Sequence, residues 1–472
     1  MRAMSMYRAV LSLSVAFLGL VLVLATWASA AERPSYQTLR FNEDWSVLSG
    51  GVSGDDPYDY MKYVELGDGV WLSTGGQLRL RYEGWQDFGF GGSANSDDFL
   101  LSRLFIHGDL HMGDNFRIFV QGKSSLAGDR DLPQGRRTLD VDEADVQNAF
   151  VDFSTTAGSH SLVLRAGRHE LLFGKQRLVS PLDWSNTRRT FDGISVIVER
   201  SPWKATAFYS RLVIVDKYDL NDSDDDVELF GIYATTKSPG PEGLKGMDLY
   251  WLGLNRSSAA FNGSSGKEDR HTLGVRLWGA VAGSRLDFDV EGAWQLGEVG
   301  DDDISAFMVA AQVGTKFSQA AMKPRLELGL DYASGDDEAG DGDVETFNHL
   351  YPLGHAYLGY IDTVGRQNII DVRATAAANP LGSLKAKLDL HGFWRADRDD
   401  ALYNAGGGVA RAGSAGTSRE VGVELDLTVK QPLSRHTVVV AGYSHFFAGD
   451  FIDESGSGDD IDFVYTTLQH TF

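Results

Sequence analysis

DFVYTTLQHTF, residues 462–472, ends the chain as a segment whose side chains alternate in character. Counting back in twos from the end gives one face of a strand, made of Phe472, His470, Leu468, Thr466 and Val464. We expect this segment to be the strand that completes the fold, as the closing strand of an outer-membrane β-barrel does. A terminal aromatic residue alone is weak support, because many soluble domains also end on a strand.

A signal-peptide pattern occupies residues 1–30. Arg2 and Arg8 flank the start, an apolar run covers 9–25, and Ala28-Ser29-Ala30 is a small-x-small cleavage signal. The alternative is an uncleaved anchor, because about 17 apolar residues can just span a bilayer. We expect cleavage and export. No later stretch is apolar for long enough to form a transmembrane helix, so a place in a membrane would require a barrel.

Alternating segments with one apolar and one polar face recur along the rest of the chain. In 77–83, for example, Leu78, Leu80 and Tyr82 face one way, and the charged residues face the other. Similar segments lie at 285–291, 326–332, 384–390 and 421–427. A soluble sandwich would also alternate, but it would cover its apolar face with a second sheet. The distribution of the connections therefore has to separate the two possibilities.

The pattern predicts eighteen strands with connections that alternate between short and long. The strands are expected near 70–85, 99–111, 116–124, 143–154, 162–170, 193–199, 203–211, 228–236, 247–255, 271–281, 285–296, 304–317, 324–334, 368–378, 384–396, 419–430, 437–447 and 461–472. The long connections include 86–98, 125–142, 171–192, 212–227, 256–270 and 335–367.

Short periplasmic turns opposite long extracellular loops, with an even strand count, are typical of bacterial outer-membrane barrels. We therefore predict an all-β fold: a transmembrane antiparallel up-and-down β-barrel of about 18 strands. The barrel is expected over 69–472, after an N-terminal periplasmic segment at 31–68 that leads into it. We expect a monomer in the Gram-negative outer membrane, in contact with lipid and lipopolysaccharide.

The formal net charge of -23 disfavours nucleic acid as a partner. Most of this charge falls in long connections such as 219–228 and 336–345. These acidic loops could bind Ca²⁺ and bridge lipopolysaccharide phosphates, but ordinary solvated loop charge is the favoured interpretation. The partial calcium-loop spacing that begins at Asp219 fails at Asp224, where such a loop needs glycine. No other cofactor is expected.

Cationic residues on the polar faces of the strands are candidates for lining the pore. Arginine facing lipid costs roughly 2–4 kcal/mol at the membrane midplane, so these side chains should point into the lumen. Arg165 and Arg168 have opposite parity, so both reach the lumen only if Gly167 forms a bulge. Acidic residues share these faces, so a plugged barrel with paired charges is the alternative. The strand candidates are Arg79, Arg81, Arg103, Arg117, Lys123, Arg165, Arg168, Arg325, Arg373 and Arg395.

The connection at 171–192 is long and basic, unlike its acidic neighbours. It carries Arg177, Arg188 and Arg189 together with Trp184. A long basic loop beside a pore is a candidate constriction that folds inward. The alternative is a loop that pins itself to the rim through its aromatic residues.

The stretch GRHELLFGKQRLVSPLDWSNTRRTFDG, residues 167–193, resembles the signature of the alginate-export family of outer-membrane barrels. Two further parts agree, from Leu39 to Leu78 and from Gly422 to Phe451. The resemblance implies an eighteen-stranded monomeric barrel whose arginine-lined lumen passes an anionic polysaccharide. It places Arg165, Arg168, Arg177, Arg188 and Arg189 in or over the conduit. The sequence departs from the family pattern at His169, where glutamine is usual, and at Lys175 beside the motif glycine.

These observations predict an outer-membrane channel for an anionic oligo- or polysaccharide such as an alginate-like polyuronate. The alternative is a general or small-anion-selective porin. An enzyme is disfavoured, because the chain has no nucleophile elbow, no H-E-x-x-H and no nucleotide-binding glycine motif.

Overall fold

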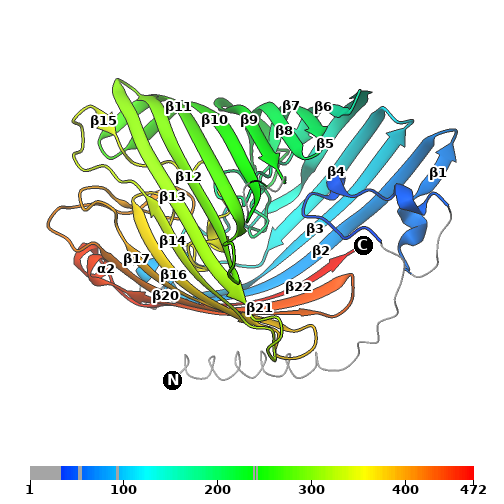
Figure 1. The fold of residues 1–472 in the computed structure, drawn as a ribbon. Helices are drawn as coiled ribbons and strands as arrows, with labels where there is room; N and C mark the ends of the chain where they lie inside the picture. The colour runs from blue at the N-terminus through cyan, green and yellow to red at the C-terminus, as the bar shows by residue number, and fades with distance from the viewer. Residues whose placement is uncertain (1–32, 51–55, 92–94, 238–239, 241–242) are drawn as a thin grey trace.

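The computed structural model describes residues 33–50, 56–91, 95–237, 240 and 243–472. The predicted signal peptide at 1–30 lies outside these described residues. The main feature is an antiparallel sheet that closes on itself, because the last strand, β22 (Ile461–Thr471), pairs with β2 (Val70–Gln86) (Figure 1). The pairing runs from Gln77 opposite Thr471 to Gln86 opposite Asp462, which confirms that the C-terminal segment closes the barrel.

Eighteen strands form this barrel in the described part of the chain. Two short strands, β1 and β15, pair with β2 and β13. Each barrel strand is antiparallel to its neighbours in the sequence. The remaining strands are β1 (Val64–Gly67), β3 (Asp97–Met112), β4 (Phe116–Ala127), β5 (Asp142–Ala157), β6 (His160–His169), β7 (Phe191–Arg200), β8 (Trp203–Ile214), β9 (Asp222–Thr236), β10 (Leu244–Phe261), β11 (Ser264–Ala280), β12 (Leu286–Val299), β13 (Asp302–Lys316), β14 (Arg325–Ala333), β15 (Asp343–Val344), β16 (Ile369–Ala378), β17 (Lys385–Trp394), β18 (Leu402–Tyr403), β19 (Val409–Arg411), β20 (Glu420–Pro432) and β21 (Thr437–Ala448).

The predicted strand count is confirmed, but two predicted long connections are largely strand. The segment 256–270 is mostly a hairpin in which β10 and β11 continue to a turn at Asn262 and Gly263. The segment 212–227 is likewise shortened by the extension of β8 and β9. The polar composition of both segments suggested loops. The two strands nevertheless stay paired through these polar segments, and this pairing gives the backbone N–H and C=O groups their hydrogen-bond partners.

The two faces of the wall differ as the alternation predicts. Large apolar side chains on the outer face stay exposed, such as Leu80 at 45% and Leu328 at 62%. The neighbouring Arg79 and Arg81 point inward and are buried. This is the arrangement that lipid requires, since the outer face must be apolar while the lumen accepts charge. No helix in the described ranges combines the length and apolar character that crossing a membrane requires.

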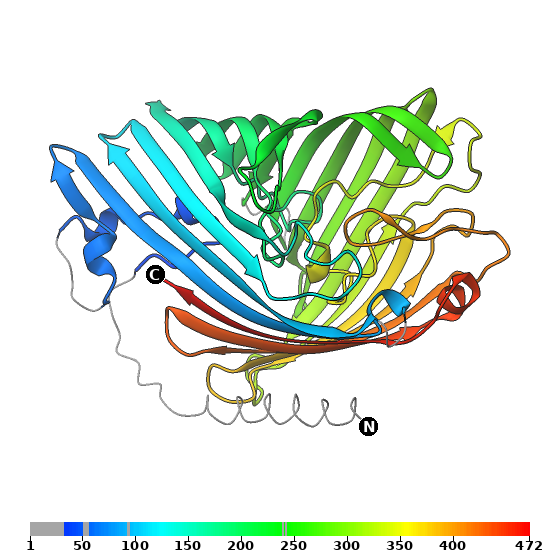
Figure 2. The ribbon, with the colours of Figure 1, turned by 180° about the vertical axis from the view of Figure 1, so that it is seen from behind.

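Two long loops fold into the barrel and fill much of its interior. We call residues 170–190 the β6–β7 loop and residues 334–368 the β14–β16 loop. Figure 2 shows both inside the ring of strands. Their apolar side chains form the largest buried cluster together with side chains of the wall, including Leu178, Phe347 and Phe393. The main hydrophobic core therefore lies inside the lumen.

The N-terminal segment packs at the end of the barrel where the C-terminus lies (Figure 1). Phe41 makes edge contacts with Phe119 and Phe150 on the inner wall, at ring-centroid distances of 5.7 and 5.1 Å. The Arg40 guanidinium donates to the carbonyl oxygens of Gly76, at 2.9 Å, and Phe472, at 3.1 Å. This segment therefore covers part of the mouth that the predicted topology assigns to the periplasm.

The described helices are short and lie in the segments before or between the barrel strands. Within the described residues, the α-helix α2 (Asp450–Ser455) follows β21 and packs Phe451 and Ile452 into the interior cluster. The 3₁₀ turns are η1 (Arg40–Asn42), η2 (Ser46–Leu48), η3 (Asp59–Met61), η4 (Phe88–Phe90) and η6 (Gly354–Ala356).

Candidate functional site

The β6–β7 and β14–β16 loops meet inside the barrel and form one block across its lumen. The backbone N–H of Tyr351 donates to the carbonyl of Leu178 at 2.8 Å, and that of Leu353 to the carbonyl of Gln176 at 2.9 Å. The Arg189 guanidinium also donates to the Tyr351 carbonyl at 2.8 Å. The two loops are therefore joined by backbone and side-chain bonds, so a movement of one must disturb the other.

Three arginines of the wall hold one side of the β6–β7 loop. Arg79 donates to the carbonyls of residues 183 and 185 at 2.7 and 2.5 Å, and Arg103 to the same pair at 3.1 Å each. Arg81 donates to the carbonyl of Trp184, and its guanidinium lies 4.3 Å from the centre of that indole ring. The predicted basic band of the lumen is thus covered here by loop backbone.

Asp183 in the β6–β7 loop adds a charge to this arginine group. Its carboxylate accepts a 2.8 Å bond from Arg103 and lies 3.4 Å from the guanidinium of Arg188. Burial alone would raise the pKa of Asp183, but the guanidiniums of Arg103, Arg188 and Arg79 lower this pKa to about 2. The carboxylate therefore stays ionised, and it strengthens the loop's attachment to the wall.

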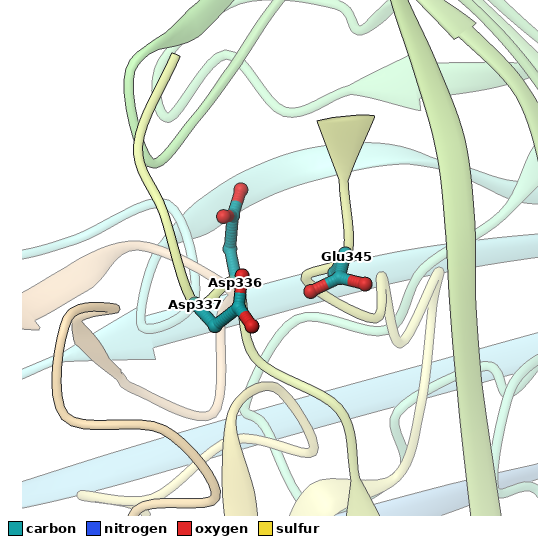
Figure 3. Close-up of side chains that lie close together, drawn as sticks. All are labelled: Asp336, Asp337 and Glu345. Carbon is teal, nitrogen blue, oxygen red and sulfur yellow. The ribbon is translucent and has the colours of Figure 1, made fainter. Parts of the chain in front are cut away.

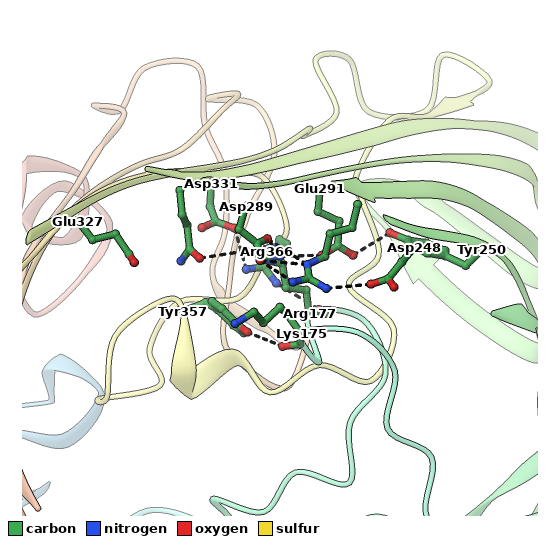
Figure 4. Close-up of polar contacts among 12 residues, drawn as sticks. Lys175, Arg177, Asp248, Tyr250, Asp289, Glu291, Glu327, Asp331, Tyr357 and Arg366 are labelled. Carbon is green, nitrogen blue, oxygen red and sulfur yellow. Dashed lines mark hydrogen bonds and ion pairs between the residues drawn. The ribbon is translucent and has the colours of Figure 1, made fainter. Parts of the chain in front are cut away.

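The other side of the block is attached to the opposite wall through Arg177 and Arg366 (Figure 4). Arg177 donates to Glu291 at 2.7 Å and to Asp289 at 3.1 Å, both on β12. Arg366, in the β14–β16 loop, donates to Asp331 at 2.7 Å and to the Arg177 carbonyl at 3.2 Å. The block thus spans the lumen from β2 and β3 to β12 and β14.

The other wall cations predicted to line the pore are paired with carboxylates. Most of these pairs are buried; Arg325 is the most exposed of the predicted arginines in the wall, with 31% of its side chain accessible. The pairs are Arg117 with Asp109, Lys123 with Asp142, Arg165 with Asp152, Arg325 with Asp287, Arg373 with Glu327, and, in the loop, Arg188 with Glu170.

Two predicted residues lie away from the inner face of the wall. The ladder of β5, β6 and β7 passes Gly167 without a bulge, so Arg168 faces the opposite way from Arg165 and pairs with Asp192 at 2.8 Å. Arg395 lies just past the end of β17. It donates to backbone carbonyls of its own loop, with its guanidinium 3.7 Å from the centre of the Phe451 ring. Strand parity alone does not reveal where a strand stops.

An open cavity of about 340 Å³ remains beside the β6–β7 loop, between it and residues 39–42. We call it the vestibule. Its lining includes four cations, Arg165, Lys204, Lys237 and Arg276, against the carboxylates of Glu170 and Asp248. Arg165 and Arg276 are paired, whereas Lys204 and Lys237 form no ion pair with any described residue. The vestibule is therefore a cavity of ligand-binding size with two cations that no described carboxylate pairs.

A larger hollow of about 740 Å³ lies on the outer surface, among Trp251, Leu273 and Trp294. These apolar side chains face lipid, so this hollow is separate from the lumen.

Lys204, Lys237 and Arg366 were not among the residues predicted from the sequence to line the pore. The two lysines could have been found, because Lys204 shares the parity of Phe208 on β8 and Lys237 that of Tyr233 on β9, both of which point inward. Arg366 lies in a loop without periodicity, and no local signal predicts its contact with Asp331.

The profile of the alginate export family matches residues 70–463 of this chain. Comparison with curated protein sequences finds no match.

Several solved structures from Pseudomonas aeruginosa share the fold. OccK2 (OpdF) in complex with glucuronate has a TM-score of 0.53 and 12% identity, with 84% of this chain and 96% of that chain covered. OpdK with vanillate has a TM-score of 0.54 and 11% identity, covering 84% and 98%. OccD3 (OpdP) has a TM-score of 0.54 and 12% identity, covering 87% and 93%. At these identities the likeness concerns the fold alone.

Proposed function

Because this chain belongs to the alginate export family and is an outer-membrane channel, we propose that it passes an anionic oligo- or polysaccharide, of the alginate-like polyuronate class, across the outer membrane. The β6–β7 loop acts as the selector. The chain reaches the membrane by export with a cleaved signal peptide and works as a monomer.

The observation that carries this proposal is the vestibule. A flexible polyanion that must both enter and leave a channel needs several weak cationic contacts rather than one tight site. Lys204 and Lys237 supply such contacts, because both residues are exposed, line the cavity and form no ion pair with a described carboxylate. The paired guanidiniums of Arg165 and Arg276 add donors to the same cavity. An anionic sugar unit can therefore be held there by charge without being trapped.

The block formed by the two loops supports selection by movement. The block occupies much of the lumen beyond the vestibule, so we infer that a polymer passes when the β6–β7 loop shifts from the wall. Arg79, Arg81 and Arg103 bind backbone carbonyls of this loop, and a polyuronate carboxylate would be a stronger acceptor for the same donors. We infer that the polymer competes with the loop for these arginines as it moves.

The rival function is a porin for small anions. It is favoured by the observation that the predicted arginines of the lumen wall already have partners in the described structure, which leaves few free charges for a long polymer. The two functions differ in whether long anionic fragments enter and block the channel.

The test is a planar-bilayer measurement on the purified full-length protein with oligouronate fragments added on the vestibule side. Fragments should block the native current. Each exposed charge contact contributes about 0.2–1 kcal/mol. Because the double variant Lys204→Gln/Lys237→Gln removes two such contacts, it should weaken the block roughly two- to thirtyfold. Lys323→Gln is the matched control, since Lys323 lies in the turn before β14 and does not line the vestibule. If neutral and anionic fragments block the current equally, or if neither blocks it, the polysaccharide channel is rejected and the small-anion porin remains.

A further inference from the structure

Three carboxylates gather at the root of the β14–β16 loop, away from the vestibule. Asp336 and Asp337 follow the end of β14, and Glu345 follows β15. Their carboxylate oxygens lie within 4.8 Å of one another (Figure 3). β15 is held by parallel pairing with the start of β13, so strands fix both sides of the cluster. The three side chains are therefore brought together by the fold and not by a free loop.

Hydrogen bonds at the base of the loop maintain this arrangement. The Ser334 hydroxyl donates to the Glu345 carbonyl at 2.6 Å. The Asp400 carboxylate accepts from the Asp336 N–H at 3.1 Å and from the Thr346 hydroxyl at 2.7 Å. The residues on both sides of the cluster thus share one acceptor, which holds them in a common position without using the three clustered carboxylates.

Asp336 has an unsatisfied oxygen. Its side chain is almost fully buried, with the residue only 1% exposed, and one carboxylate oxygen accepts from the Glu338 N–H at 3.2 Å. The other oxygen, Oδ2, is buried without a hydrogen-bond partner. No described Lys, Arg or His forms an ion pair with Asp336, Asp337 or Glu345. Buried carboxylate oxygens nearly always have a hydrogen-bond or ion partner, so an oxygen without one indicates a bound ion or water.

A cavity of about 250 Å³ adjoins the cluster on the side of Asp337 and Glu345. Asp337 and Glu345 line it, together with Asp397 and the aromatic Tyr332. Asp397 lies 3.7 Å from Arg419, so its charge is already partly matched. All these features describe an acidic cavity without its counter-charge.

We propose that Asp336, Asp337 and Glu345 bind a calcium ion. The donors are all carboxylate oxygens, and no nitrogen or sulfur ligand stands in the cluster, so an alkaline-earth ion fits better than zinc or copper. Calcium accepts irregular oxygen geometry with added waters, which the cavity can hold, whereas magnesium demands near-ideal octahedral geometry. The ion would tie the end of β14 to β15 at the root of the β14–β16 loop. This proposal is independent of the transported solute.

The probe is Tb³⁺, which replaces calcium and emits when excited through a nearby aromatic ring, here Tyr332. The purified full-length barrel should show saturable Tb³⁺ emission that Ca²⁺ displaces at lower concentration than Mg²⁺. Glu345→Gln and Asp337→Asn should weaken binding about tenfold or more, since each removes a charged ligand. Asp343→Asn is the control, because it removes the same charge from an exposed position in the same loop.

Equal Tb³⁺ titrations for Glu345→Gln, Asp343→Asn and the native protein would overturn the proposal, as would displacement by Mg²⁺ and Ca²⁺ at the same concentration. Folding of each variant is checked by its heat-dependent shift in gel mobility. As a second readout, Ca²⁺ should slow proteolytic cleavage between residues 336 and 345 in the native protein and in Asp343→Asn, but not in Glu345→Gln. Cleavage that is unaffected by Ca²⁺ in the native protein would also overturn it.

Discussion

Replacing Arg177 with methionine should release the β6–β7 loop from the far wall of the barrel. The Arg177 side chain is fully buried and donates to Glu291 at 2.7 Å and to Asp289 at 3.1 Å. Its backbone carbonyl also accepts from Arg366 at 3.2 Å. The substitution keeps a long side chain but removes the only guanidinium of the β6–β7 loop that reaches β12 in the described structure. The perturbation therefore acts on one attachment of the block.

The expected loss follows from the partners that remain. Removing one member of a buried ion pair costs about 3–5 kcal/mol, because the other charge is left buried and unpaired. Here Asp289 keeps Arg276 at 2.6 Å, and Glu291 keeps the Tyr250 hydroxyl at 3.0 Å, so the lower value of about 3 kcal/mol applies. This loss raises the population with a released loop roughly a hundredfold, since each 1.4 kcal/mol is about a factor of ten.

Single-channel recording in planar bilayers measures the release directly. Arg177→Met should open more often or conduct more current than the native channel. Adding Glu291→Gln should reverse part of the effect, because it removes the carboxylate left without its partner. Arg211→Met is the control, since Arg211 pairs with Asp225 on the exposed surface and should cost at most about 1 kcal/mol. If Arg177→Met and Arg211→Met have the same open probability and conductance, the contact of Arg177 with β12 does not hold the loop.

Two further predictions concern other attachments inside the barrel. Burial lowers the pKa of Lys62 to about 7, and Arg40 adds to the shift, while the unfolded value is 10.5. Between pH 7 and 10.5 the unfolded chain therefore binds more protons than the folded chain. Docking of residues 33–50 should strengthen by about 1.4 kcal/mol per pH unit as the pH rises through this window. Hydrogen exchange of the amides in 33–50 measures this docking, and an equal pH dependence in Lys62→Met would contradict the prediction. The Asn186 amide donates to the carbonyls of Ser102, Leu126 and Asp140 at 2.9–3.1 Å, so Asn186→Ala should destabilise this region by about 1–3 kcal/mol. Limited proteolysis should then cut residues 128–141 faster, and an unchanged cleavage rate would count against this role.

The wall of the barrel could be predicted because its signal is local. Lipid outside and water inside impose a period of two on each strand, and this period is visible in any short window such as 77–83. The closing strand was expected at 461–472 and is observed at Ile461–Thr471. The prediction failed at 256–270, where polar residues indicated a loop and the structure has a hairpin, because composition does not show whether a backbone finds a partner.

The candidate site could be predicted only in part. The parity of Arg79, Arg81 and Arg103 placed them correctly on the inner face, but their partners are backbone carbonyls about a hundred residues away in the sequence, which no pattern reveals. Arg165 and Arg168 could both face the lumen only with a bulge at Gly167; the ladder has none there, so Arg168 faces the other way. The basic character of 171–192 did mark a loop that folds inward.

The sequence by itself therefore determined the class of fold, the number of strands and which side chains face lipid, because these follow from contacts between neighbouring residues and from the solvent on each side. Only the tertiary structure decided which charges remain free. Arg177 and Glu291 lie 114 residues apart and meet because the loop crosses the lumen. Lys204 and Lys237 form no ion pair with a described residue, although Glu199 lies opposite Lys204 in the β7–β8 ladder. Whether a charge binds solute or structure depends on such distant contacts, and these exist only once the barrel has closed.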